Sequence, residues 1–165
     1  MKKNAYTLIE IMVVVAATGL IMTTMIGVIL GSFKAQNRAK SNNKITENGK
    51  WIMNELRKNV FNSRASDIEC DEANGSWVQV KNLDDAVITT LSCSQDDNQI
   101  ASVSAEGVGY TLNSNEVDIK SCNNFVSCES VGGKVTGVTF NFMLEAETSG
   151  VGTSQLFSTK VTVRN

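Results

Sequence analysis

A long uncharged stretch near the N-terminus places the strongest constraint on what this chain can fold into. Residues 11–33 contain no charged side chain and are rich in Val, Ile, Leu and Met. As an α-helix, which rises about 1.5 Å per residue, this stretch covers a bilayer core of about 30 Å. Basic residues flank it on both sides, so the distribution of positive charge does not decide its orientation. We therefore expect a membrane-spanning helix over residues 6–33.

One residue at the leading edge of this stretch is out of place in lipid. Glu10 immediately precedes the uncharged run, and an ionised carboxylate in hydrocarbon costs about 2.5–3.5 kcal/mol on insertion scales. A residue kept at that cost is expected to be functional. A plain signal anchor that tolerates a charge at its interface end is one alternative. A secretory signal peptide cleaved near Ala16-Ala17 is another. The apolar region of such a peptide is about 7–15 residues long, however, and the uncharged run here, residues 11–33, is longer.

Composition narrows the classes of function. The chain has no His, and its formal net charge is −2. Without His, the Ser/His and Cys/His nucleophile pairs and most zinc sites are excluded. A negative net charge argues against nucleic acid as a direct partner, because binding phosphates needs a basic surface. We therefore expect no enzymatic activity, no cofactor and no nucleic-acid partner.

Helical periodicity continues beyond the apolar stretch, over residues 34–66, but there it marks only one face. Apolar residues recur at spacings of seven, four and four, with Met53 alongside, which is typical of an amphipathic helix. This stripe comprises Ile45, Ile52, Met53, Leu56 and Val60. Gly49 and Ser41-Asn42-Asn43 weaken the helix locally and allow a bend. Trp51, beside the stripe, and Trp77, at the start of a predicted strand, are expected to be partly buried in the core.

After Asp67 the hydrophobic period changes from that of a helix to that of strands. The predicted strands are SWVQVK (76–81), AVITTLSC (86–93), IASVSA (100–105), GYTL (109–112), EVDIK (116–120), VTGVTFNFMLEA (135–146) and LFSTKVTVR (156–164). Asn113-Ser114-Asn115 predicts a hairpin loop, and residues 96–99 and 148–154 predict loops. The whole pattern predicts an α+β fold, in which an antiparallel β domain over residues 67–165 packs on the amphipathic helix.

The cysteines all lie in the polar part of the chain, at Cys70, Cys93, Cys122 and Cys128. An even number of cysteines beyond a membrane segment predicts two disulfides and an oxidising compartment. We favour pairing neighbours in sequence, Cys70 with Cys93 and Cys122 with Cys128, and the other two connectivities stay open. The spacings do not form the two short C-x₂₋₄-C pairs of a zinc site.

Two acidic stretches are candidate calcium ligands. Asp96-Asp97-Asn98, together with Asp84-Asp85, would supply the hard oxygen atoms that Ca²⁺ prefers. Asp and Asn in such positions are more often ordinary turn residues, and the spacing is not that of an EF-hand. We therefore expect no metal.

The residues around Glu10 resemble a known processing signal. Lys2-Lys3 and Ala5 are followed by Tyr6-Thr7-Leu8-Ile9-Glu10 and then by the apolar run. This order resembles the class III signal of type IV pilins and pseudopilins, in which a dedicated peptidase cuts between a small residue, usually Gly, and an aromatic residue, usually Phe. The resemblance implies a leader of residues 1–5, cleavage between Ala5 and Tyr6, and N-methylation of Tyr6. It also implies an assembly role for Glu10, whose carboxylate would meet the terminal ammonium of a neighbouring subunit.

Two further segments are similar to minor pseudopilins of the J type and their pilus counterparts. These are ITENG (45–49), followed by Leu56, and the ending KVTVRN (160–165). Major pilins usually carry a helix-kinking Pro late in the apolar segment, and this chain has no Pro, which favours a minor subunit. The resemblance implies a pilin fold and a role in initiating or capping a filament. The filament would be a type IV pilus or a pseudopilus of type II secretion or DNA uptake.

The same resemblance implies partners and a location. The partners would be other pilin or pseudopilin subunits, the prepilin peptidase and an assembly platform in the cytoplasmic membrane. The chain would cross that membrane once, with its C-terminal domain outside, in the periplasm or at the cell surface, and would then move to a filament, near its tip. The residues alone leave a second function open, which is a single-pass membrane-anchored binding module or adhesin that joins no filament.

Overall fold

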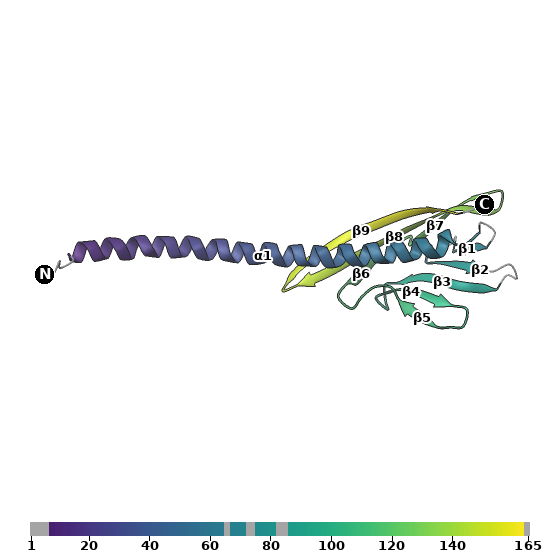
Figure 1. The fold of residues 1–165 in the computed structure, drawn as a ribbon, viewed down its shortest axis with the longest axis horizontal. Coiled ribbons are helices and arrows are strands. Elements are labelled where there is room, and N and C mark those ends of the chain that lie inside the picture. The colour runs from purple at the N-terminus through teal and green to yellow at the C-terminus, as the bar shows by residue number, and fades with distance from the viewer. Residues whose placement is uncertain (1–6, 65–66, 72–74, 82–85, 164–165) are drawn as a thin grey trace.

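One long helix, α1 (Leu8–Phe61), runs from the N-terminal end of the molecule into the β domain, and its first half stands clear of the other elements (Figure 1). The computed structural model describes residues 7–64, 67–71, 75–81 and 86–163. At about 1.5 Å per residue, the 54 residues of α1 extend for about 80 Å. The helix is continuous through Ser41-Asn42-Asn43 and Gly49, where the sequence allowed a bend.

The first sheet is an antiparallel meander whose five strands follow one another in chain order. Its strands are β1 (Ile68–Cys70), β2 (Trp77–Lys81), β3 (Val87–Ser94), β4 (Gln99–Ser104) and β5 (Gly109–Thr111). This order leaves β1 and β5 at the two edges of the sheet.

The second sheet is built around one long strand, β8 (Lys134–Thr148). Strand β9 (Val151–Thr162) pairs with β8 along one side, while β7 (Val126–Val131) and β6 (Asp118–Ser121) pair with opposite ends of its other side. The β8–β9 turn consists of Ser149 and Gly150, which have φ angles of 51° and 76°. Two successive residues with positive φ are the mark of a type I′ hairpin turn.

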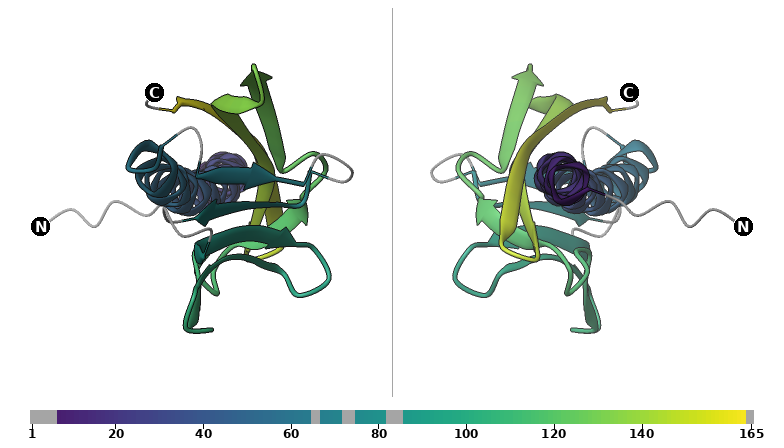
Figure 2. Two further views of the ribbon diagram at one scale, coloured as in Figure 1. Left: turned by 90° about the vertical axis from the view of Figure 1, so that its right-hand side faces the viewer. Right: turned by 90° about the vertical axis from the view of Figure 1, so that its left-hand side faces the viewer.

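Both sheets lie around one side of the C-terminal half of α1, and the three elements enclose a single core (Figure 2). The predicted stripe is confirmed, because Ile45, Ile52, Leu56 and Val60 are all 0% exposed and Met53 packs against them. Alternate residues of two strands that the sequence predicted are buried on the same side. These are Val138, Phe140 and Phe142 on β8, and Phe157, Thr159, Val161 and Val163 on and just after β9.

Gly49 also lies on the buried face of α1, where there is no room for a larger residue. A Cβ atom at this position would collide with the ring of Phe157, which lies directly over the helix backbone. Phe157 in turn stacks on Phe142, with ring centroids 5.4 Å apart. Gly49 therefore lets β9 approach α1 closely rather than bending the helix.

Several expectations from the sequence about the β domain, and one about α1, are wrong. Asn113-Ser114-Asn115 is not a hairpin loop, because β5 belongs to the first sheet and β6 to the second. Residues 148–154 are not a loop, since β8 and β9 continue up to the two-residue turn. Strands β1 and β7 were not predicted. Trp51 is 50% exposed rather than buried, whereas Trp77 is partly buried as expected.

Candidate functional site

The bare half of α1 is the most unusual surface of the molecule. Every residue from 8 to 33 is exposed, and the large apolar side chains among them keep between 53% and 78% of their surface accessible. Among the described residues, this is the one helix long and apolar enough to cross a membrane, with a mean hydropathy of 2.4 in its best window. An apolar surface of this size marks a site of contact with lipid or protein.

The polar side chains within this half of the helix already have partners. The hydroxyl groups of Thr18, Thr23, Thr24 and Ser32 each donate a hydrogen bond of 2.8–3.0 Å to a carbonyl three or four residues earlier. Their polarity is therefore satisfied within the helix itself. Such self-satisfied hydroxyls suit a helix that lies in hydrocarbon, where no water is available to bond them.

Glu10 occupies the third position of α1 and closes a capping box with Thr7. In this box the backbone N–H of Thr7 donates to Oε2 of Glu10 at 3.4 Å. The N–H of Glu10 also donates to the carbonyl of Thr7 at 3.1 Å, which is a backbone bond of the first turn. A carboxylate here also interacts favourably with the positive end of the helix dipole. Sequence reasoning missed this local role, although Thr-x-x-Glu before an apolar run is its signature. Ala5 and Tyr6 lie outside the described residues.

The two disulfides pair differently from the favoured prediction. Cys70 bonds to Cys128 and Cys93 bonds to Cys122, with Cα atoms 6.5 Å and 5.8 Å apart. The predicted Cys70–Cys93 pair is wrong because these residues lie on β1 and β3, with β2 between them. The predicted Cys122–Cys128 pair is wrong because β6 and β7 meet opposite ends of β8. Both observed bonds join the first sheet to the second.

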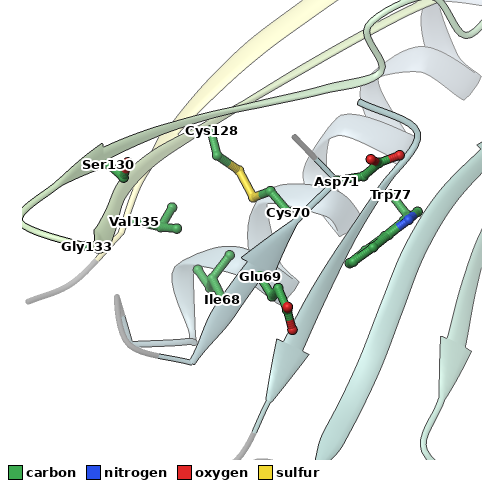
Figure 3. Close-up of a pocket in the computed structure, with 9 residues that line it drawn as sticks. All are labelled: Ile68, Glu69, Cys70, Asp71, Trp77, Cys128, Ser130, Gly133 and Val135. Atoms are coloured by element: carbon green, nitrogen blue, oxygen red, sulfur yellow. A yellow bond between two sulfur atoms is a disulfide. The ribbon is translucent and has the colours of Figure 1, made fainter. Parts of the chain in front are cut away.

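A cleft lies where the edge strands β1 and β7 face each other across the Cys70–Cys128 bond (Figure 3). Its volume is about 590 Å³, and it is lined by Ile68, Glu69, Cys70, Asp71, Trp77, Cys128, Ser130, Gly133 and Val135. The carboxylates in it already have partners. Glu69 forms an ion pair with Lys81, and Asp71 accepts hydrogen bonds from the N–H and hydroxyl of Ser76. The cleft therefore combines apolar side chains with carboxylates that are already paired.

The candidate calcium residues of the β3–β4 turn act as turn and bridging residues. Asp97 accepts a 2.7 Å hydrogen bond from the hydroxyl of Ser94. Asn98, with φ of 52°, donates to Asp118 at 2.6 Å and accepts from the N–H of Ile119 at 2.5 Å. These bonds tie the first sheet to β6. Within the described residues no group of three His, Cys, Asp or Glu is placed to hold a metal ion, and Asp84-Asp85 lie outside them.

Comparisons of the chain with models of known protein families, with curated proteins and with solved structures found no match. Three features of the molecule therefore carry the functional inference. These are the exposed apolar half of α1, the carboxylate at its leading edge, and the disulfide-linked β domain packed on its other half.

Proposed function

We propose that this protein is a minor subunit of a type IV pilus-like filament, and that it helps to initiate or cap that filament. The observation that carries the proposal is the division of α1 into two halves. Residues 8–33 are bare and apolar with Glu10 at their leading edge, whereas the face from Ile45 to Val60 is buried against the β domain. A bare half of this kind suits lipid before assembly and a bundle of neighbouring helices after it.

Glu10 gives the bundle its axial register in this proposal. Cleavage before Tyr6 creates an α-ammonium one helical turn from Glu10. In a bundle, the carboxylate of one subunit meets the ammonium of the next, and the two charges attract strongly at low dielectric constant. Leaving either charge unpaired there is costly. The hydrogen bond from Thr7 to Glu10 satisfies the carboxylate only partly while the subunit is alone, so insertion beside another subunit is favoured.

The proposal also assigns partners and a location. A prepilin peptidase removes residues 1–5, and an assembly platform in the cytoplasmic membrane moves the helix from lipid into the filament. The β domain lies outside that membrane, where its two disulfides are stable in an oxidising compartment. The absence of Pro from the chain and the resemblance to J-type subunits favour a minor position near the tip.

The test is the mass and N-terminal sequence of the membrane-expressed protein, with and without a prepilin peptidase. We expect a mature terminus at Tyr6, heavier by one methyl group, only when the peptidase is present. Ala5→Leu, which replaces the small residue before the cut, is expected to retain the leader and serves as the control. An intact Met1 in the presence of active peptidase, or a cut near Ala17, would rule the proposal out.

A second candidate is a membrane-anchored binding module that joins no filament. The observation that favours it is the cleft of about 590 Å³ between β1 and β7, beside Trp77. This candidate predicts that the leader is not cleaved and that Glu10→Ala leaves function unchanged, so the same N-terminal analysis distinguishes it from the first.

A further inference from the structure

A short basic segment of α1 lies between its bare apolar half and the part that packs on the β domain. Lys34, Arg38 and Lys40 are its charged residues, all three are exposed, and we refer to them as the basic collar. No Asp or Glu occurs between Glu10 and Glu47 in the sequence. The collar is therefore a concentrated positive charge with no carboxylate of its own helix close by.

The collar residues have no ion pair within the part of the chain that the structure describes. The next cation along the helix behaves differently, because Lys44 pairs with Glu116 of the β domain at 3.1 Å. Since a helix turns about 100° per residue, Lys34 and Arg38 lie in phase with the face that meets the sheet, and Lys40 lies on another side. The positive charge therefore extends around the helix instead of facing one neighbour.

The collar directly follows the apolar run, at the place along the helix where a lipid headgroup layer would begin. Phe33 is the last residue of the apolar run, and Ser41 is the first residue held by the β domain. The hydroxyl oxygen of Ser41 lies 2.8 Å from the hydroxyl oxygen of Thr148 and 3.3 Å from the carbonyl oxygen of Val151, so it is hydrogen-bonded to the β8–β9 hairpin. Phe33 and Ser41 are about 12 Å apart along the axis, so a headgroup layer about 5–7 Å thick fits between the apolar run and the β domain.

The end of the β domain nearest the bare half of α1 is the β8–β9 turn, which lies beside Ser41 and hence just beyond the collar (Figure 1). Among the acidic groups near this end, Glu116 is paired with Lys44 and Glu145 with Lys120, at 3.1 Å and 2.8 Å. Glu147, on β8 next to the β8–β9 turn, is exposed. The positive charge of the collar thus lies between the β domain and the bare half of α1.

We propose that the basic collar binds the anionic headgroups of phospholipids in the leaflet next to the β domain, and so sets the depth of α1 in the membrane. The inference rests on the membrane insertion contained in the proposed function. Arg38 suits the phosphate group because its guanidinium can donate two parallel hydrogen bonds, while Lys34 and Lys40 act as point charges. Lipid is favoured over an acidic protein because the collar directly continues a bilayer-length apolar helix on one side.

The experiment uses the full chain reconstituted in vesicles of equal parts phosphatidylcholine and phosphatidylglycerol. Trace spin-labelled analogues of each lipid report which one is motionally restricted by the protein. We expect phosphatidylglycerol to be preferred about threefold or more and the preference to fall toward one at high salt, because the interaction is electrostatic and screened. Flotation of the protein with the vesicles and its resistance to alkaline extraction measure insertion separately.

The decisive variant is Lys34→Gln with Arg38→Gln and Lys40→Gln, which we expect to insert normally but to lose the preference for phosphatidylglycerol. Its matched control removes three exposed cations elsewhere, at Lys50, Lys58 and Lys134, and is expected to keep the preference. Lys50 is about 15 Å along the helix from the collar, beyond a Debye length of about 8 Å.

Three results would overturn the inference. If the wild type inserts but does not prefer phosphatidylglycerol, the collar does not bind anionic lipid, and an acidic protein surface becomes the alternative partner. A collar variant that keeps the preference would place the lipid contact elsewhere. Both results leave the proposed membrane anchoring intact. Failure of the wild type to insert would overturn the anchoring and the collar inference together.

Discussion

Gly49 provides a sharp test of how α1 packs against the β domain, because two physical effects predict opposite signs for Gly49→Ala. Helix propensity alone favours Ala over Gly by about 1 kcal/mol at an interior helix position. In this structure, however, the added Cβ would collide with three atoms of the Phe157 ring. Phe157 is only 5% exposed and stacks on Phe142, so its ring cannot move away without disturbing the core.

The net magnitude follows from the two terms. Overpacking a well-packed core costs about 1–3 kcal/mol, and the closeness of the Phe157 ring favours the upper end. After subtracting the propensity gain of about 1 kcal/mol, we expect Gly49→Ala to destabilise the β domain by about 2 kcal/mol. A domain of this size then loses about 8 °C or more in Tm, which thermal unfolding of the full chain in detergent, followed by near-UV circular dichroism, will measure.

Two companion variants make the result specific. Gly31→Ala changes a glycine of the same helix that has nothing within 4 Å of the added Cβ, and it is expected to leave the Tm of the β domain unchanged. Phe157→Leu in the Gly49→Ala background is expected to recover part of the loss, giving a positive coupling in a double-mutant cycle. A neutral or stabilising effect of Gly49→Ala alone would refute the close approach of β9 to the helix.

Two further predictions concern the disulfides and the leading carboxylate. Peptide mapping of the oxidised protein is expected to link Cys70 to Cys128 and Cys93 to Cys122, and reduction is expected to destabilise the domain by about 2–4 kcal/mol per bond; recovery of a Cys70–Cys93 peptide would contradict the fold. Glu10→Gln, which keeps the shape but removes the charge, is expected to abolish incorporation into filaments while leaving leader cleavage intact, as measured by immunoblotting of sheared filaments and of membranes. Normal incorporation of Glu10→Gln would remove the charge pairing from the proposed function.

The parts of the fold that the sequence predicted are those in which periodicity is a local signal. The stripe from Ile45 to Val60 was readable because burial on one face of a helix repeats over several turns. The alternation of Val138, Phe140 and Phe142 was readable for the corresponding reason in a strand. In both cases the side chains that face the core differ clearly in polarity from their neighbours. The pattern can therefore be recognised without knowing which element packs against it.

The parts that escaped prediction depend on contacts between residues far apart in the chain. Strand β7 (Val126–Val131) contains two serines and a glutamate, and it forms because β8 offers it a partner edge. The stretch 148–154 is rich in Ser, Thr and Gly and resembles a loop, but the long β8–β9 pairing extends through it. The disulfide pairing was missed for the same reason, because closeness in sequence says nothing about which strand edges meet between two sheets.

In the candidate site, too, the features with a local sequence pattern were predicted and those that depend on distant contacts were not. The exposed apolar half of α1 and Glu10 were predictable because the residues of this segment are apolar on every face of the helix, so a single carboxylate at its edge stands out. Two properties were recognised only with the structure. Glu10 caps its own helix through Thr7, so its charge has a local partner before any assembly. The cations at Lys34, Arg38 and Lys40 became notable only once Lys44 was seen to be paired and Ser41 to be held by the β8–β9 hairpin. A charged flank carries little information by itself, because most charges near a helix end are merely solvated. It gains meaning when the structure accounts for the neighbouring charges and leaves these three without an ion pair among the described residues, directly beyond an apolar segment long enough to cross a bilayer.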